Sequence, residues 1–225
     1  MTVQTVAILG GTGPQGRGIA LRLARAGVNV VIGSRDGARA ADAAAEMGGG
    51  PDLPLRGAAN AEAAQAADIV FVAVPWPAHH DTLAGLRTDL AGKVVVDVVN
   101  PLEFDAQGPV GITVPEGSAA QQAQALLPDS VVVSGFHHVS AKTLLDESRP
   151  VDEDVMICGD DEDAKLAVIA LANLMPGVRG IDAGPLRLSG LAEGMTAVLL
   201  SINRRYRTTT GFRLTDLDPA RRRPA

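Results

Sequence analysis

The sequence predicts an α/β fold with a doubly wound parallel sheet, and three of its features indicate this fold class. Apolar runs of strand length alternate with helical stretches over much of the chain. A glycine-rich turn follows the first of these runs at once. The 225 residues are 46% hydrophobic but only 3% aromatic, which suits buried aliphatic strands covered by alanine-rich helices.

The strands expected in the first part of the chain lie at residues 3–9, 28–32, 69–74, 94–99 and 131–133. A helix should follow the glycine-rich turn, and further helices are expected at about 37–47, 60–67, 79–89 and 118–126. Right-handed crossovers between parallel strands then place helices on both faces of the sheet. Beyond them we expect a strand at 155–158, a helix from Glu162 to Leu174, a short strand at 178–181 and a last helix from Leu191 to Tyr206.

The glycine-rich turn at residues 10–16 is typical of a Rossmann fold that binds a dinucleotide. In this pattern Gly11 allows the tight turn, Gly13 lets the pyrophosphate approach the backbone, and Gly16 lets the helix pack closely on the strand. Pro14 suits the first position of the helix, where its missing N–H costs nothing. The free N–H groups and the dipole of that helix would bind the anionic pyrophosphate.

The end of the second expected strand indicates NADP rather than NAD. An NAD enzyme usually carries an acid there, which accepts hydrogen bonds from the ribose 2′-hydroxyl. This chain has Ser34 and Arg35, with Arg39 one helical turn further on. Arginine pairs with a phosphate through two charge-assisted hydrogen bonds. Asp36 is the competing feature, since it could turn inward towards a ribose.

Two parts of unequal size are expected. Residues 1–140 would form an NADP-binding Rossmann domain. Residues 141–225 would form a small C-terminal α/β extension with a basic tail, on the substrate side. Because the strands and helices within residues 151–207 are too few for an independent substrate domain, we expect them to pack on the sheet edge and form the second wall of the cleft.

Further candidate ligands follow the strands, because ligands of such sheets lie across the carboxyl ends of the strands. Val74, Pro75 and Trp76 follow one strand, and Asn100 and Pro101 follow the next. Both segments are expected to lie along the nucleotide towards the nicotinamide. A plain proline turn after a strand is the alternative in each case.

Two histidines follow the strand at 131–133. His137 or His138 would lie near the reactive end of the cofactor. The alternative for either is a histidine held in a loop by local hydrogen bonds.

Composition argues against several other classes of protein. The net charge of −6 argues against general nucleic-acid binding, and one cysteine with four scattered histidines makes no metal site. Cys158 is expected to be a core residue in a reducing compartment. We expect no signal peptide and no membrane span, hence a cytoplasmic protein. The arginine-rich end at 221–225 is expected to be a disordered tail.

These residues resemble a known family, the NADPH-dependent reductases of the deazaflavin coenzyme F420. The resemblance covers nearly the whole chain. Its marks are Gly10-Gly11-Thr12-Gly13, Gly33-Ser34-Arg35 with Arg39, Pro75-Trp76, Glu116, Ser118-Ala119-Ala120, His137 with Ala141, Cys158-Gly159-Asp160-Asp161 and Asp182-Ala183-Gly184-Pro185-Leu186. The last two are more specific than the glycine-rich turn, which many unrelated enzymes share.

The resemblance implies direct hydride exchange between carbon 4 of the nicotinamide and carbon 5 of the deazaflavin. The residues that it assigns to NADP are Thr12, Gly13, Pro14, Gln15, Ser34, Arg35, Arg39, Asn100 and Ala141. For the deazaflavin it suggests His137, Val139 and Thr196. The chain departs from the family at Gly190 and Gly194, where some members have an arginine and a serine, and Arg187 could replace the missing charge.

Such a reaction requires no catalytic nucleophile, base or metal. Hydride transfer between two flat heterocycles needs the reacting carbons stacked about 3–3.5 Å apart. Reduction of the deazaflavin also requires one proton, and hydrogen-bond donors would stabilise the negative charge that develops on the ring. Backbone N–H groups around Gly194, Met195 and Thr196 are the first candidate donors, and His137 is the second.

Two other functions stay open. A reductase of the same architecture could act on an imine, a carbonyl or a metal chelate, with His137, His138 or Ser140 as proton donor. The other alternative is a non-catalytic NADP(H) sensor. The chain beyond residue 135 argues against it, because this part supplies a second wall and hence a cleft for a second ligand. We also expect a homodimer, because the apolar segment Ala197–Leu200 of the last helix would otherwise expose much of one face.

Overall fold

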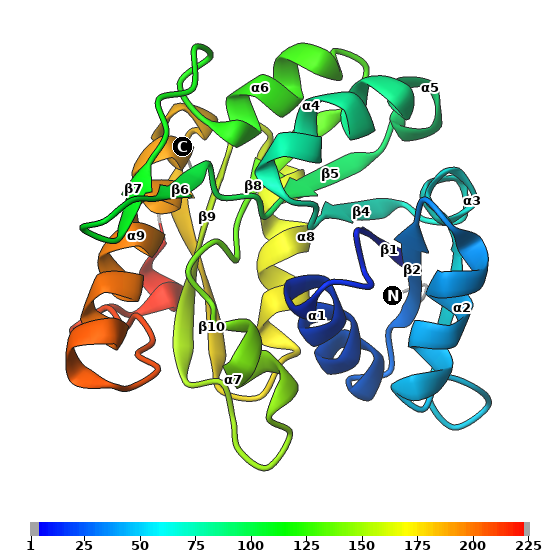
Figure 1. Ribbon diagram of the computed structural model, residues 1–225, viewed down its shortest axis with the longest axis horizontal. Helices are drawn as coiled ribbons and strands as arrows, with labels where there is room; N and C mark the ends of the chain where they lie inside the picture. Colours follow the sequence, from blue (N-terminus) through cyan, green and yellow to red (C-terminus); the bar gives the residue numbers. More distant parts are fainter. Residues whose placement is uncertain (1–4, 223–225) are drawn as a thin grey trace.

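The computed structural model describes residues 5–222. Its centre is an eight-stranded sheet in the order β10-β9-β8-β5-β4-β1-β2-β3, with helices on both faces (Figure 1). The strands are β1 (Thr5–Leu9), β2 (Asn29–Ser34), β3 (Leu55–Ala59), β4 (Ile69–Val72), β5 (Val94–Asp97), β8 (Val131–Ser134), β9 (Glu153–Gly159) and β10 (Val178–Gly184). This is the doubly wound α/β fold that the sequence predicts.

Helices connect most of these strands. They are α1 (Pro14–Arg25), α2 (Gly37–Glu46), α3 (Asn60–Gln65), α4 (Trp76–Gly85), α5 (Arg87–Leu90), α6 (Ala119–Leu126), α7 (Ala141–Leu145), α8 (Glu162–Asn173) and α9 (Ser189–Tyr206), with short 3-10 turns η1 (Leu186–Leu188) and η2 (Pro219–Arg221). A hairpin of β6 (Leu102–Phe104) and β7 (Pro109–Gly111) stands apart from the sheet and packs against α9 (Figure 1).

Alternate residues of the central strands face two separate cores. On β1, Val6 and Ile8 pack towards α1, α2 and α8, whereas Ala7 and Leu9 pack towards α3, α4 and α6. Both sets are almost fully buried, as expected for a parallel strand covered on both faces. This burial explains why the strands are continuous aliphatic runs in the sequence.

One strand pair differs from the expected parallel sheet. β9 runs antiparallel to β8, while all other neighbouring pairs described in the sheet are parallel. Only Val133 and Ser134 pair with β9, through its last two residues. Most of β9, and β10 beside it, therefore extends past the carboxyl end of β8. The expected boundary between residues 1–140 and 141–225 lies between β8 and α7 and stays a prediction.

Several elements lie outside the sequence-based expectations. β3 was missed because Leu55-Arg56-Gly57-Ala58-Ala59 contains no β-branched residue, and α7 and the β6–β7 hairpin are short. The helix expected at 79–89 begins earlier, at Trp76, and breaks at Leu86 into α4 and α5. Element type was therefore easier to predict than element boundaries.

The C-terminal segment is held against the sheet, so the expectation of a disordered tail is wrong for Arg221 and Arg222. Arg222 donates to Asp182 of β10 over 2.8 Å and also pairs with Glu162. Each guanidinium contact with a carboxylate is a charge-assisted hydrogen bond that fixes the segment locally. The rest of the expected tail, residues 223–225, lies outside the described residues.

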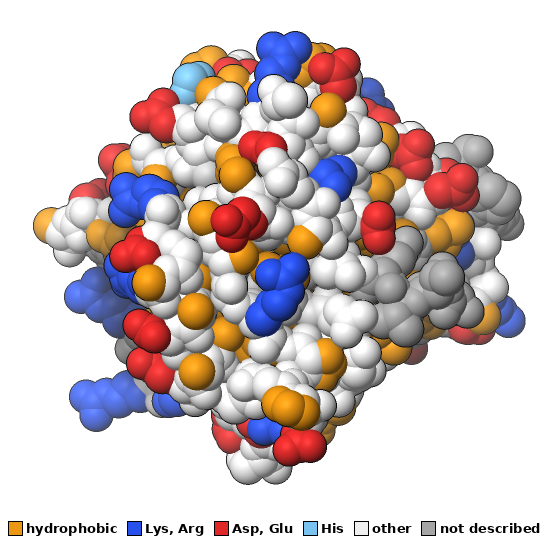
Figure 2. Space-filling model, turned by 90° about the vertical axis from the view of Figure 1, so that its right-hand side faces the viewer, with side chains coloured by type: hydrophobic (Ala, Val, Ile, Leu, Met, Phe, Trp, Pro, Cys, Tyr) orange, Lys and Arg blue, Asp and Glu red, His pale blue; other side chains and the backbone are white. Residues whose placement is uncertain are grey.

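The surface beside β2, α2 and α3 carries a mixture of charges. In Figure 2, basic and acidic side chains alternate across this face instead of gathering by sign. No helix within residues 5–222 is long and apolar enough to cross a membrane.

Candidate functional site

The carboxyl ends of the central strands form one row, and the register of the sheet defines it. Gly33, Leu9, Val72, Asp97 and Ser134 are successive partners across β2, β1, β4, β5 and β8. The segments that follow these five residues are the ones singled out in the sequence. The fold therefore brings nearly all of the predicted NADP segments to a single edge.

The glycine-rich turn is shaped by close backbone packing. Gly10 has a left-handed φ of 72°, and Gly11 follows it inside the turn that the Gly13 N–H closes on the Gly10 carbonyl over 3.0 Å. The turn also needs glycine at position 11 for space, since a Cβ there would lie 2.6 Å from the Cβ of Ile32. A Cβ on Gly16 would lie 2.7 Å from the Cα of Gly11, so the close approach at Gly16 is to the glycine-rich turn, whereas the sequence predicts it to the strand.

Gly13 and Pro14 open α1 in a way that leaves its first N–H groups free of side-chain partners. Gly13 is the N-cap and makes no side-chain cap, and Pro14 occupies the first helical position as predicted. A Cβ on Gly13 would approach only the Gly10 carbonyl, at 3.4 Å. The turn thus presents open backbone and a helix dipole to an anion, the arrangement that binds a pyrophosphate.

The segment after β2 gives Asp36 and the two arginines different environments. The Asp36 carboxylate accepts the N–H groups of Ala38 and Arg39, over 2.9 and 3.4 Å, as the N-cap of α2. Its Oδ1 therefore serves as the cap of α2. Arg35 and Arg39 are exposed, and neither forms an ion pair within the described part of the chain. Their guanidinium groups can meet a phosphate at this end of β2.

Gln15 ties the glycine-rich turn to the loop after β8. Its Nε2 donates to the carbonyls of Phe136 and Val139, over 3.3 and 3.2 Å. Phe136 has a left-handed φ of 61°, which is uncommon for a bulky residue, and packs edge-to-face on Phe71 at 5.5 Å. The loop is thus fixed in position beside the predicted cofactor site.

Three of the predicted residues meet at the carbonyl of His137. Asn100 Nδ2 donates to this oxygen over 2.8 Å, and Thr196 Oγ1 donates to it over 2.9 Å. Thr196 Oγ1 also lies 3.4 Å from Asn100 Oδ1. The ends of β5 and β8 and the helix α9 are therefore joined at one point.

The two histidines have different environments. The His137 side chain is only 3% exposed, and neither ring nitrogen has a partner among the described residues. Burial lowers its pKa to about 4, so the imidazole is neutral near neutral pH. His138 Nε2 donates to the Asp154 carbonyl over 2.6 Å, and its ring packs edge-to-face on Phe212. The alternative of a locally held loop histidine therefore describes His138.

The amides proposed as donors on α9 are not free. α9 begins at Ser189, slightly earlier than the expected Leu191, so Gly194, Met195 and Thr196 lie beyond its first turn. N–H groups past the first four positions bond within the helix. What this part of α9 can offer to a ligand is its side chains, which are half-buried at Met195 and Thr196.

Gly190 and Gly194, the two positions where the chain departs from the family pattern, differ in the space around them. A Cβ on Gly190 would lie 2.7 Å from the Gly117 carbonyl, so the fold requires glycine there. Nothing lies within 4 Å of a Cβ on Gly194, where the absence of a side chain leaves space. Arg187 is exposed on η1, next to the start of α9.

A buried polar cluster at the same edge is not among the residues that the sequence predicts. Asp97, the last residue of β5, and His79 of α4 are both fully buried and lie 2.6 Å apart, from Oδ2 to Nε2. The available signal was the single acid within the aliphatic run at 94–99. A buried carboxylate requires a partner, and the partner is 18 residues away in the sequence.

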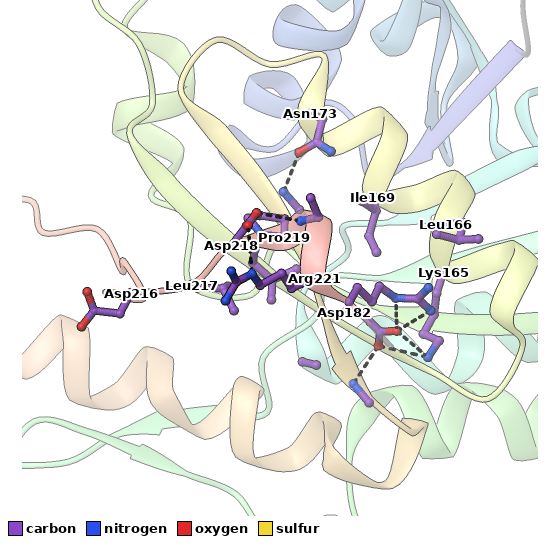
Figure 3. Close-up of a pocket in the computed structure, with 16 residues that line it drawn as sticks. Lys165, Leu166, Ile169, Asn173, Asp182, Asp216, Leu217, Asp218, Pro219 and Arg221 are labelled. Atoms are coloured by element: carbon purple, nitrogen blue, oxygen red, sulfur yellow. Dashed lines mark hydrogen bonds and ion pairs between the residues drawn. The ribbon is translucent and has the colours of Figure 1, made fainter. Parts of the chain in front are cut away.

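A cavity of about 920 Å³ lies elsewhere, between α8, β10 and the segment 216–222 (Figure 3). The predicted site residues are not among those that line it. Its main charges neutralise one another, since Asp182 accepts from Lys165 over 3.0 Å and from Arg222 over 2.8 Å (Figure 3). This cavity is therefore a feature of the C-terminal packing.

The fold and this edge define a Rossmann-type dinucleotide-binding oxidoreductase. The family model described as "NADP oxidoreductase coenzyme F420-dependent" matches residues 5–101. The chain is 39% identical to the F420-dependent NADP reductase of Methanocaldococcus jannaschii, over 95% of this chain and 99% of that protein. It is 40% identical to the reductase of the same name from Methanothermobacter marburgensis, over 94% and 98% of the two chains.

A solved structure agrees with these relatives. It comes from Arthrobacter sp. FB24, was provisionally described as an F420-dependent NADP reductase, and is 28% identical with a TM-score of 0.81, over 94% of this chain and 99% of that one. The chain belongs to the family of the F420-dependent NADP reductases.

Proposed function

We propose that this protein transfers a hydride directly between NADP(H) and the deazaflavin coenzyme F420. The observation that carries the proposal is the similarity to two named F420-dependent NADP reductases over nearly the full length of each chain. The geometry supports it, because the edge that gathers the predicted residues contains a buried, neutral histidine, His137, and the one acid–histidine pair described there, Asp97 with His79, is fully buried and bonded to itself. Such a site suits a reaction that depends on positioning.

In this proposal NADP(H) lies along the carboxyl ends of β2, β1, β4 and β5. The open N-terminus of α1 binds the pyrophosphate, and Arg35 and Arg39 bind the 2′-phosphate. The proposed NADP-binding residues are Gly11, Thr12, Gly13, Pro14, Gln15, Gly16, Ser34, Arg35, Arg39, Val74, Pro75, Trp76, Asn100, Pro101 and Ala141.

The deazaflavin would stack on the nicotinamide between the loop after β8 and α9. The proposed contacts are His137, Val139, Gly194, Met195 and Thr196. β9 and β10, which extend past the end of β8, would form the far wall of this cleft. The bound coenzymes supply and accept the hydride, while the chain aligns the rings and excludes water.

The direct test is the loss of visible absorbance of oxidised coenzyme F420 when it is mixed with the protein and NADPH, with NADH in parallel. Rapid bleaching with NADPH and little with NADH is the expected result. Binding of NADPH without bleaching would discard the deazaflavin and direct the search to imine, carbonyl and metal-chelate acceptors. Binding without turnover of any acceptor would support the sensor instead.

We propose a homodimer in the cytoplasm. Leu191, Val198 and Tyr206 of α9 are 75%, 57% and 76% exposed, and Phe104 of the adjacent hairpin is 72% exposed. An apolar surface of this extent favours a symmetric partner. Light scattering should give twice the chain mass, and replacing Leu191 and Val198 together with glutamate should give the monomer. A monomer mass for the unmodified protein at micromolar concentration would contradict the dimer.

A further inference from the structure

A buried chain of hydrogen bonds runs below Trp76. Asp97 Oδ2 lies 2.6 Å from His79 Nε2, and His79 Nδ1 lies 3.0 Å from Gln122 Oε1. The other end of the Gln122 amide donates from Nε2 to Glu116 over 3.3 Å, at the surface. This orients Oε1 towards the imidazole, so both ring nitrogens of His79 face acceptors.

Two acceptors around an imidazole favour its doubly protonated form, in which both ring nitrogens donate. Burial lowers the pKa of His79. The hydrogen bond to Asp97 and the negative charge of Asp97 raise it by more than burial lowers it, so the pKa lies above its usual value. The other ionisable groups that face this pair are Glu193 on α9 and the neutral His137. The chain therefore places a histidine–carboxylate pair inside the fold.

The pair holds the backbone of the turn after β5. Asp97 Oδ1 accepts the N–H of Val99 over 2.9 Å. Because Asn100 follows directly, this bond sets the direction in which its side chain leaves the sheet. Asn100 in turn donates to the His137 carbonyl, which also binds Thr196.

The same pair supports the start of α4. The rings of His79 and Trp76 are stacked, with centroids 5.4 Å apart and planes inclined by 30°. Trp76 is half-buried, and the fully buried His79 side chain supports one of its faces. An imidazolium against an indole face is a favourable cation–π contact.

We propose that Asp97, His79 and Gln122 form a positioning unit that holds Trp76 and the Asn100 turn in the arrangement that binds the nicotinamide half of NADP(H). The inference rests on the proposed function only in taking Trp76 and Asn100 as nicotinamide-side residues. Asp97, His79 and Gln122 do not themselves contact the cofactor or the substrate. They act through Trp76 and Asn100, which they hold in position. Buried ion pairs often add little net stability, which makes a positioning role the natural reason for this one.

The first experiment uses the fact that Trp76 is the only tryptophan of the chain. A protonated imidazole quenches indole emission more strongly than a neutral one, so emission of the cofactor-free protein should rise as the pH passes upward through the pKa of His79. His79→Gln should abolish this rise. His80→Gln is the matched control, because His80 is exposed on the same helix and should change nothing. Glu193→Gln separates the titration of Glu193 from that of His79.

The second experiment measures NADPH binding and kinetics. His79→Gln and Asp97→Asn should each raise the Kd and KM for NADPH about 10- to 100-fold, because one partner of a charged hydrogen bond is lost. The kcat at saturating NADPH should fall less than tenfold. Circular dichroism and melting curves test whether the variants are folded. If Asp97→Asn does not fold, the affinity of His79→Gln for NADPH tests the inference.

Two results would overturn the inference: Trp76 emission independent of pH in the unmodified protein, or folded variants with unchanged affinity for NADPH. The Trp76 emission and the Kd for NADPH are both measured without coenzyme F420, whereas KM and kcat require it as the hydride acceptor. A protein that passes both and does not reduce the deazaflavin would refute the proposed function and leave the positioning unit intact.

Discussion

Arg35 and Arg39 lie exposed at the end of β2 and in the first turn of α2, and we predict that they select NADPH. The double variant Arg35→Ala with Arg39→Ala should bind NADPH about 100-fold more weakly and NADH as before, since each charged hydrogen bond contributes about 1.5–3 kcal/mol. Affinities can be read from Trp76 fluorescence. Arg87→Ala, which removes an exposed arginine on α5, is the control. An equal loss for both nucleotides would contradict the prediction.

His137 is predicted to matter through its shape and its backbone, not as an acid. Its pKa of about 4 leaves the ring neutral at the pH of the assay, and it is the carbonyl that binds Asn100 and Thr196. His137→Ala should therefore lose less than about a thousandfold in activity at saturating substrates, and the pH profile of kcat should keep its form. A larger loss, with a changed acid limb, would identify a general acid.

Among the elements, the turn before α1 contains one glycine that we expect to affect only NADPH binding and another that we expect to affect both NADPH binding and stability. Gly13→Ala should leave the melting temperature nearly unchanged, because its Cβ meets only one atom at 3.4 Å. The added methyl group would obstruct the pyrophosphate, so NADPH affinity should fall at least tenfold. Gly16→Ala should lower both the melting temperature and the affinity for NADPH. Its Cβ would overpack against the Gly11 backbone, which costs about 1–3 kcal/mol of folding stability. Thermal melts with and without NADPH measure the two effects.

The elements also differ in how well the sequence predicts them. β1, β4 and β5 were predicted because both of their faces are buried, which leaves continuous aliphatic runs. β3 is an edge strand made mostly of small residues, so its sequence carries no strong strand pattern. Its strand conformation depends on the hydrogen bonds of its parallel pairing with β2. The antiparallel direction of β9 depends on how the loop at 135–152 packs, with α7 held against α1. No local pattern encodes that contact.

At the scale of the whole molecule, stability should depend on pH through two neighbouring acids. Burial raises the pKa of Glu153 to about 7 from 4.5. The stability it contributes is therefore complete below pH 4.5 and is lost as the pH rises through 7. Asp154 behaves oppositely. Its burial is outweighed by hydrogen bonds from Arg179, Leu214 and Arg213, which lower its pKa to about 2, so its contribution is lost only in acid.

Glu153→Gln tests the first of these effects. Relative to the unmodified protein, the variant should gain up to about 3 kcal/mol between pH 4.5 and pH 8, because it no longer buries a charge. Chemical denaturation at pH 5 and pH 8 measures the difference. The same difference in stability at both pH values would show that Glu153 is ionised at both, and hence that burial does not shift its pKa.

The fold class, the glycine-rich turn, the basic end of β2 and the family can all be predicted from the amino-acid sequence. These features are encoded in periodicity and in short motifs, which depend on neighbours a few residues away. Which side chains meet depends instead on how the sheet and helices pack. Thr196 reaches Asn100 across 96 positions, and His79 reaches Asp97 across 18. Such pairs form because buried polar groups must find partners, and the packing of the sheet and helices determines which partners lie within reach.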